Sequence, residues 1–321
     1  MKGIILFSFV ALSGMRSFCQ QPYFEGTLTY HVSVQSKFDN LSEQDAEKVL
    51  ATGGTQTVDC KNGNYRQLNP YVEQITIAKD KKTYVKFPKL DTLYYVDFST
   101  DTSGLQGIQK TDSVFKVAGY SCKAITLRTA NYTNRYYYTE ALRNNPALEM
   151  ENTIGYNHVR ARETGAAVYL WERSDYWAGI VIDSCVQVEQ KSIDDHVFDL
   201  PALPMKKFDP TTLQSIPRFP GKDGAWLRYL QSNLDPNIAA KYVKLPKDQQ
   251  QAQVIVQVEF IVSEDGSISD IQVVNKKDVH PKLAAEAVRV IEESPRWVPA
   301  QFYGQKIKRS VRQSVVFAVT R

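Results

Sequence analysis

The sequence has 321 residues, of which 43% are hydrophobic and 23% are charged. A chain of this size and apolar content can bury two hydrophobic cores, which excludes a disordered chain. The formal net charge of +4 is too small for the strongly basic face that nucleic-acid binding requires, so we expect no nucleic acid among the partners.

The first twenty residues have the pattern of a secretory signal peptide. Lys2 supplies a positive end, residues 4–12 are apolar, and Ser17–Gln20 form the exit region. The apolar run is shorter than the roughly 20 residues that span a bilayer. Residues 1–20 are therefore predicted to be a cleaved signal that delivers the chain to the periplasm. The alternative is an uncleaved segment that anchors the chain in the inner membrane.

Residues 21–205 contain many short runs of tyrosine, valine and threonine separated by turn signals. Phe24–Val34 alternates as a strand, Ser42–Ala51 has a helical pattern, and further strand-like runs continue to Lys191. Strands at this close spacing predict an antiparallel meander that curls into a half-barrel. The helix and its neighbours are expected to fill the interior. The alternative is an apolar interior that holds a lipid or another hydrophobic ligand.

Three motifs of this region match a known group of secreted proteins. They are F-E-G-T-L-T-Y at 24–30, G-Y-S-C-K-A at 119–124 and Y-Y-Y-T-E-A-L-R-N-N-P at 136–146. With these motifs the region resembles GLPGLI-type proteins, although the Gly-Leu-Pro-Gly-Leu-Ile signature itself is absent. The resemblance implies a sheet that half-wraps a helix, as in LolA-type lipoprotein carriers.

Three cysteines, Cys60, Cys122 and Cys185, follow the predicted signal. In an oxidising compartment two of them are expected to pair. Cys122 and Cys185 both lie in strand-like runs, so we favour a disulfide between these two. The cysteine spacing matches no zinc site, and we expect no metal.

Five prolines between residues 201 and 220 separate this region from the rest of the chain. Each proline disfavours helical conformation in the residue before it. Residues 206–222 are therefore predicted to be an extended, stiff, proline-rich linker between two domains, 21–205 and 223–321.

The C-terminal region begins with a helical pattern at Ala225–Leu234 and continues with a hairpin. Between residues 253 and 274 apolar side chains alternate with polar ones, which is typical of a strand that is buried on one face. Asp265-Gly266 interrupts the alternation and is the strongest short-range signal for a hairpin turn.

A helix and a last strand follow the hairpin. His280–Glu293 has apolar residues on one helical face, with Asp278 as the expected N-cap and Pro281 in the first turn. Arg309–Val319 alternates again as a strand. The order strand–strand–helix–strand predicts an antiparallel sheet with helices packed on it, so the fold class of the whole chain is α+β.

The same residues form three motifs of a known family. They are V-x-F-x-V-x-x-D-G-S-I-S-D-I-x-V-V at 258–274, L-A-A-E-A-V-R-V-I at 283–291 and P-R-W-V-P-A at 295–300. Residues 223–321 thereby resemble the C-terminal domain of TonB, the periplasmic arm of the energy transducer of double-membrane bacteria. The Tyr-Pro pair that usually follows the first helix of the family is missing here.

The resemblance implies that the domain recognises an extended peptide, such as the TonB box of an outer-membrane receptor, beside a sheet edge. The chain is then a periplasmic binding or adaptor protein linked to TonB-dependent transport. In the alternative, the N-terminal region carries a hydrophobic ligand and the C-terminal domain is a docking module. Trp297 is expected to fill the core between sheet and helix, and the alternative is a contact with the partner. Gln301 and Tyr303 are further candidate contacts. The candidate edge is the final strand, with Arg309, Val311, Arg312, Gln313, Ser314, Val316 and Ala318.

A search for catalytic motifs finds none that is specific. There is no Gly-x-Ser-x-Gly elbow, no phosphate-binding glycine loop and no His-Glu-x-x-His. We therefore predict no catalytic residue, no cofactor and no enzyme activity. The alternative is a glycosidase-like cleft with carboxylates and aromatic side chains from one stretch of sequence: Trp171, Glu172, Asp175, Tyr176, Trp177 and Asp183.

Overall fold

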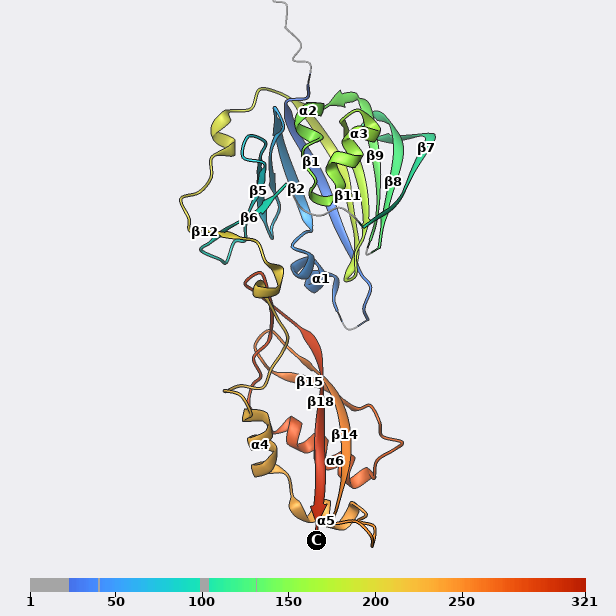
Figure 1. The fold of residues 1–321 in the computed structure, drawn as a ribbon, viewed down its shortest axis with the longest axis vertical. Helices are drawn as coiled ribbons and strands as arrows, with labels where there is room; N and C mark the ends of the chain where they lie inside the picture. Colours follow the sequence, from blue (N-terminus) through green and yellow to red (C-terminus); the bar gives the residue numbers. More distant parts are fainter. Residues whose placement is uncertain (1–22, 40, 99–103, 131) are drawn as a thin grey trace, which may run out of the picture.

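The N-terminal part of the computed structural model is one sheet of twelve strands (Figure 1). The structure describes residues 23–39, 41–98, 104–130 and 132–321, so the predicted signal segment lies outside the described residues. The strands are β1 (Gly26–Ser36), β2 (Gly54–Lys61), β3 (Asn64–Leu68), β4 (Glu73–Ile77), β5 (Lys82–Lys86), β6 (Leu93–Asp97), β7 (Leu105–Val117), β8 (Tyr120–Thr129), β9 (Thr133–Arg143), β10 (Ala167–Asp175), β11 (Gly179–Gln190) and β12 (Met205–Lys207).

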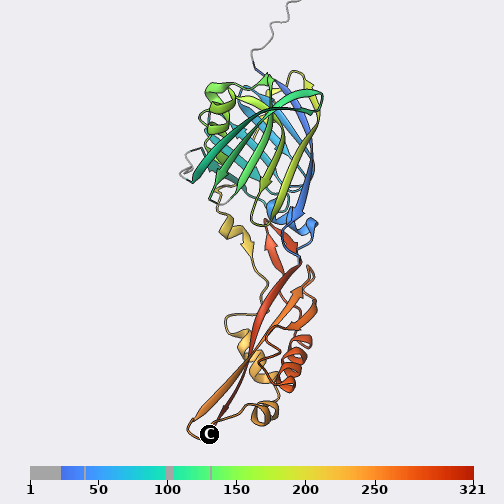
Figure 2. The same ribbon diagram turned by 90° about the vertical axis from the view of Figure 1, so that its right-hand side faces the viewer.

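The sheet is antiparallel apart from one short pair, and it is open. The strand order is β12-β6-β5-β4-β3-β2-β1-β11-β10-β9-β8-β7, in which only β12 and β6 run parallel. Pairing of β1 with β11 joins the two halves of the sheet. The sheet is curved (Figures 1 and 2), and it does not close into a barrel within the described residues. The predicted α+β class with a large antiparallel sheet is confirmed.

Short helices between β9 and β10 lie over the concave face of this sheet (Figure 1). They are α2 (Pro146–Glu149), the 3-10 turn Ile154–Tyr156 and α3 (Asn157–Thr164). The helix predicted at Ser42–Ala51 does not lie over this face, although its Ala46 belongs to the apolar core beside β1. That helix, α1 (Glu43–Leu50), lies at the end of the sheet nearer the C-terminal part. It does so because its buried residues pack against β1 and against a hairpin of the C-terminal part.

The main sheet of the C-terminal part has three antiparallel strands with a helix on one face. β14 (Gln251–Val262) lies between β15 (Ile268–Val273) and β18 (Arg309–Thr320), as the alternation predicts. Helix α6 (Pro281–Glu292) packs on the sheet, and α4 (Ala225–Asn233) and α5 (Pro236–Tyr242) complete the layer. The core residues with at most 2% exposure include Val256, Val258, Phe260, Val262, Leu283, Ala287, Val290, Ile291, Val315 and Phe317.

Two turns of the C-terminal part show how local sequence directs the chain. Gly266 has φ +84°, and a Cβ there would lie 2.2 Å from the carbonyl oxygen of Trp297, so the Asp-Gly turn requires glycine. The prediction of Asp278 as N-cap of α6 is wrong. His280 caps the helix by accepting a hydrogen bond from the Lys282 N–H at 3.2 Å, because the helix starts directly after it at Pro281.

The proline-rich segment is attached to both parts of the chain. At its start, β12 pairs with β6 of the N-terminal sheet. After the 3-10 turn Pro210–Leu213, β13 (Gln214–Ser215) pairs with β16 (Ala300–Phe302), which forms a hairpin with β17 (Gln305–Ile307). The segment is therefore tied down by strand pairing near both of its ends.

The β16–β17 hairpin makes the contact between the two parts. The Tyr303 ring at its tip stacks on Phe87 of the N-terminal part, with ring centroids 4.5 Å apart and planes 3° apart. Gln214 Nε2 donates a hydrogen bond to Tyr303 Oη at 3.1 Å. Residues of both hairpin strands pack in one apolar cluster with Val49 of α1, and Lys48 of α1 also forms an ion pair with Glu264.

We expect Tyr303→Ala to loosen this contact. The variant loses the stacking on Phe87 and the burial of one aromatic ring, a change of about 1.5–3 kcal/mol. Limited proteolysis should then cut residues 208–222 several-fold faster than in the parent chain. Tyr303→Phe keeps the ring and should be cut at the parental rate. Equal cleavage of Tyr303→Ala and Tyr303→Phe would show that the ring does not hold the two parts together.

Candidate functional site

Strand β18 is an open edge of the C-terminal sheet. It pairs with β14 in unbroken register, from Arg309 opposite Val262 to Thr320 opposite Gln251. Among the described residues no strand pairs with its other side (Figure 2). A twelve-residue strand with one unpaired side carries backbone donors and acceptors that another extended chain can complete.

The register shows which backbone groups face the open side. Residues directly opposite each other in an antiparallel pair point their N–H and C=O groups either at each other or both away. The Gln257 C=O accepts a hydrogen bond from Val274 N–H at 2.8 Å, on the β15 side of β14. Ser314 lies opposite Gln257. The backbone groups of Ser314 therefore point away from β14, toward the open side.

Val316, two residues along the strand from Ser314, is oriented in the same way. The Asn275 side-chain amide donates to the Ile255 C=O at 2.9 Å, again on the β15 side of β14. Val316 lies opposite Ile255, so its N–H and C=O also face the open side. Val315, between Ser314 and Val316, points its backbone groups toward β14 and its buried side chain into the core.

Side chains of β18 alternate between the core and the uncovered face of the sheet. Arg312, Ser314, Val316 and Ala318 are exposed there, and Val316 is 41% exposed. The Arg312 guanidinium pairs with Glu259 of β14 at 2.7 Å. The side chains of the other three predicted edge residues are partly buried: Arg309, Val311 and Gln313.

The three other predicted contact residues lie in different surroundings. Trp297 is 2% exposed, and its indole N–H donates to Ser294 Oγ at 3.0 Å. Gln301 pairs with Ser215 in the hairpin sheet, and Tyr303 packs on the N-terminal part. The structure thus places Trp297 in the core and Tyr303 in the contact between the two parts. A partner contact at these positions stays a prediction.

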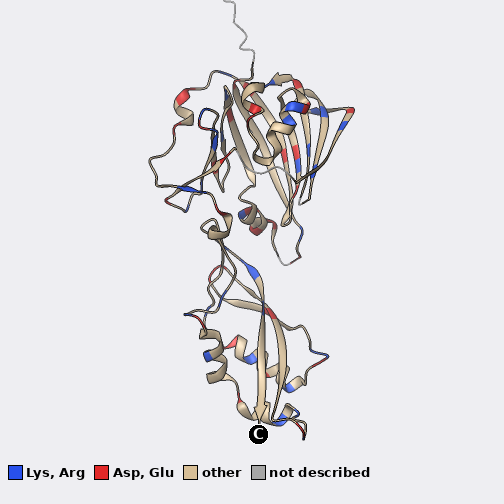
Figure 3. Ribbon diagram, viewed as in Figure 1, with Lys and Arg blue, Asp and Glu red and all other residues tan. Residues whose placement is uncertain are grey.

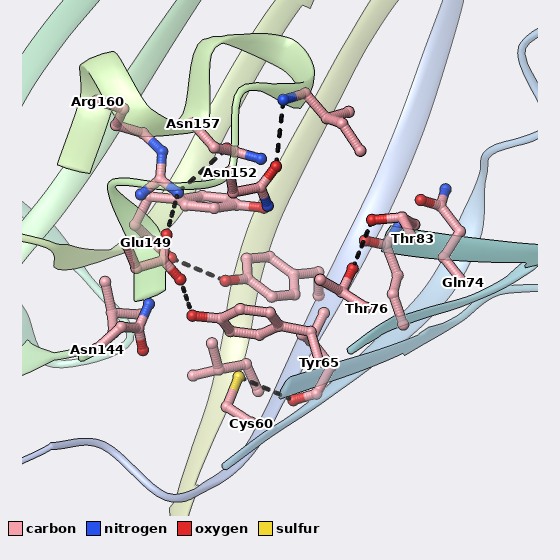
Figure 4. Close-up of a pocket in the computed structure, with 17 residues that line it drawn as sticks. Cys60, Tyr65, Gln74, Thr76, Thr83, Asn144, Glu149, Asn152, Asn157 and Arg160 are labelled. Atoms are coloured by element: carbon pink, nitrogen blue, oxygen red, sulfur yellow. Dashed lines mark hydrogen bonds and ion pairs between the residues drawn. The ribbon is translucent and has the colours of Figure 1, made fainter. Parts of the chain in front are cut away.

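A cavity of about 150 Å³ lies between the concave face and the short helices (Figure 4). At its wall, Arg160 Nη2 lies 3.6 Å from Glu149 Oε2, and both side chains are buried. The Tyr65 hydroxyl donates a hydrogen bond to the carboxyl group of Glu149. The Arg160 guanidinium also lies over the Tyr169 ring, 4.9 Å from its centroid. Burial raises the pKa of Glu149, and the nearby Arg160 opposes that rise.

Sequence reasoning missed this polar cluster because α3 has no amphipathic pattern. Its sequence, N-H-V-R-A-R-E-T, is mostly polar and has no apolar stripe, although Arg160 is buried. The only sequence signal for the buried Arg160 was its position between two apolar residues, Val159 and Ala161, in an otherwise polar run. The cluster makes the interior partly polar, and its cavity is below the roughly 300–1,000 Å³ of ordinary ligand pockets.

A second cavity, of about 360 Å³, contains the two carboxyl groups Glu172 and Asp183. They lie directly opposite each other on β10 and β11. Burial and the neighbouring Glu172 raise the pKa of Asp183 to about 8. Burial also raises the pKa of Glu172, while the Ser174 hydroxyl, which donates to Glu172 at 2.6 Å, opposes the rise.

Only some of the residues proposed from the sequence for a glycosidase-like cleft lie together in the structure. Tyr176 and Trp177 line the second cavity together with the two carboxyl groups. Asp175 instead forms an ion pair with Lys37. Trp171 stacks on Tyr137, with ring centroids 4.4 Å apart, and does not line the cavity.

The cysteines and the candidate metal ligands give no further site. Cys60, Cys122 and Cys185 are buried free thiols, so the predicted disulfide is not formed in this structure. Burial raises the pKa of Cys185 to about 11. The described part of the chain has no group of three or more His, Cys, Asp or Glu side chains placed to hold a metal ion. Pairing of Cys122 with Cys185 in solution stays a prediction.

Figure 3 shows basic and acidic residues interspersed along both parts of the chain. Within the described ranges, no helix is long and apolar enough to cross a membrane.

Comparisons with known proteins identify the C-terminal part. Residues 247–319 match the family model of the Gram-negative bacterial TonB protein C-terminal region. No curated protein matches the sequence. Two structures of PNGF-II, in space groups C2 and P21, have TM-scores of 0.34 and 0.37 and sequence identities of 13% and 10%. The matches cover 75% and 92% of this chain but only 44% and 65% of the PNGF-II chains.

Proposed function

Residues 247–319 form a TonB C-terminal domain, and from this premise we propose that the chain is a cell-envelope binding protein that captures an extended peptide by strand addition to β18. TonB-like domains are transport-associated domains without enzyme activity, and they interact with proteins such as outer-membrane receptors. A protein partner and a link to envelope transport follow from the family alone. The mode of capture and the kind of peptide are our proposal.

One observation carries the proposal. The open side of β18 presents the backbone N–H and C=O groups of Ser314 and Val316, which no described strand pairs. An added strand would satisfy these groups, and main-chain hydrogen bonds of this kind supply affinity in strand-addition complexes. The exposed side chains of Val316 and Ala318 would offer apolar contacts to every second residue of the peptide.

The partner that fits is the TonB box of an outer-membrane receptor, recognised in the periplasm. The N-terminal half-barrel (21–205) and the TonB-like domain (223–321), joined by residues 206–222, would form an adaptor whose N-terminal domain occupies the place of a long spacer. We do not favour carriage of a lipid by the N-terminal domain, because the concave-face cavity is small and contains the Glu149–Arg160 pair.

The test is capture of receptor segments by the immobilised full chain. Solubilised outer membrane is passed over the chain, bound proteins are identified by mass spectrometry, and peptides copied from their N-termini are titrated by fluorescence anisotropy. We expect Val316→Pro to weaken peptide binding about tenfold, because one edge donor is lost at a net cost of about 1 kcal/mol and the ring also obstructs the edge.

Val316→Ala is the matched control, since it keeps the backbone N–H and also removes the exposed side chain. It should bind several-fold more tightly than Val316→Pro, because it loses only the apolar contact of the side chain. Circular dichroism should show both variants folded, because proline is tolerated on an edge strand. Equal peptide affinity of Val316→Pro and Val316→Ala would exclude this edge, and failure of the parent chain to capture any receptor would exclude the proposed partner.

A further inference from the structure

Among the described residues, the cavity of about 360 Å³ that contains Glu172 and Asp183 is lined by acidic groups without basic ones. Its lining contains the carboxyl groups of Glu172 and Asp183 but no lysine, arginine or histidine. The guanidinium of Arg160 acts on Glu172 electrostatically, but it pairs with Glu149. Two partly buried acids therefore line the same space without a cation of their own.

One of these acids also lacks a hydrogen bond. Asp183 Oδ1 has essentially no solvent-exposed surface and no hydrogen-bond partner among the described residues. A buried acceptor without a donor is unfavourable, because nothing replaces its lost hydrogen bonds to water. The rest of the lining is rich in groups that bind polar ligands. The amides of Gln56, Gln67 and Gln74 come from β2, β3 and β4, and Gln214 and Tyr303 close the cavity from the C-terminal part.

We propose that this cavity binds a small organic cation, an alkylammonium or guanidinium group, between Glu172 and Asp183. The N–H donors of such a group would satisfy Asp183 Oδ1, and its charge would allow both carboxyl groups to ionise. The aromatic side chains of Tyr169, Tyr176 and Trp177 line the same space and offer ring faces to a cation. A neutral hydroxyl-rich molecule would supply donors but would leave the two acids to share a proton.

Binding of a cation should be linked to pH. Besides Glu172 and Asp183 themselves, seven charged or titratable groups of the described residues act on the pair or line its cavity: Arg160 of α3, Tyr169 of β10, Tyr176 after β10, Tyr30 of β1, Tyr132 and Tyr136 before and in β9, and Tyr303 of the hairpin turn. The phenols stay neutral below pH 9 because burial raises the pKa of each. The proton on Asp183 is therefore the one that a bound cation displaces.

Affinity for a cation should fall as the pH is lowered. With the pKa of Asp183 at about 8, the free cavity holds this proton at pH 7. A cation favours the ionised form, so binding releases a proton and affinity falls about tenfold for each pH unit below 8. Calorimetry at pH 7 in phosphate and in Tris should show close to one proton released for each cation bound.

The experiment titrates the full chain with two probes, butylammonium chloride and an N-acetylated lysine-containing tripeptide. Asp183→Asn and Glu172→Gln keep the shape of the side chains and should each weaken binding by at least tenfold. Asp248→Asn, an equal change of charge on an exposed loop far from the cavity, should leave binding unchanged. Melting temperatures establish that every variant is folded.

The two probes distinguish the sources of the cation. Binding of butylammonium alone assigns the cavity to a free small amine, and binding of the tripeptide assigns it to a lysine side chain of a protein partner. A tripeptide with norleucine in place of lysine should not bind. The proposal fails if neither probe binds at millimolar concentration, if Asp183→Asn binds as the parent chain does, or if binding releases no proton.

Discussion

Trp297→Ala should lower the free energy of unfolding of the C-terminal part by about 3–5 kcal/mol, the range for truncating a large buried aromatic side chain. The Trp297 ring packs edge-on against Phe260 of β14 at 5.0 Å and against Phe219 at 5.6 Å. It also contacts Trp226 of α4, with ring centroids 5.6 Å apart. Truncation opens a cavity where strand, helix and the preceding segment meet.

The measurement is urea unfolding of the full chain followed by far-ultraviolet circular dichroism. Trp177→Ala is a matched control, because the same change is made at a ring that is 55% exposed in the N-terminal part. It should cost less than about 1 kcal/mol. If both variants unfold at the same urea concentration, Trp297 does not hold the core, and a contact with a partner becomes the better account of this residue.

Arg160→Met should lower the free energy of unfolding of the N-terminal part by about 3–5 kcal/mol, because removing one member of a buried ion pair leaves the other charge uncompensated. Glu149 is 4% exposed and would then lose its only cationic neighbour among the described residues at that wall. The long, unbranched methionine side chain preserves most of the volume over the Tyr169 ring, so the loss of charge dominates.

The pH dependence checks this cause. Burial raises the pKa of Glu149 in the folded chain, so its contribution to stability is largest at low pH and is lost as pH rises through the folded pKa. Without Arg160 the pKa of Glu149 rises further. Arg160→Met should therefore lose more stability between pH 5 and pH 8 than the parent chain does. Thermal unfolding at several pH values measures the difference.

A second substitution isolates the pair. Glu149→Gln combined with Arg160→Met removes both charges and should recover at least half of the lost stability, with a flat response to pH. If the double variant is as unstable as Arg160→Met alone, the stacking of the guanidinium on Tyr169, and not the charge of Glu149, accounts for the role of Arg160.

Most of the C-terminal part was predictable because its signals are local. Alternation of apolar residues along β14, the Asp-Gly turn and the apolar face of α6 each reflect a choice made within a few residues of sequence. The helix cap at His280 was missed because capping depends on the residue at which the helix begins, and patterns place helix ends only approximately.

The sequence by itself determined the α+β class, the TonB-like elements and the final strand as a candidate edge, since period and turn chemistry are properties of short segments. Only the tertiary structure decided that Val316 directs its backbone to the open side, that Tyr303 packs on Phe87, and that Glu172 lies opposite Asp183. Each of these depends on the register or docking of segments distant in sequence. Such arrangements are selected by packing of the whole chain, which leaves no periodic trace in the residues themselves.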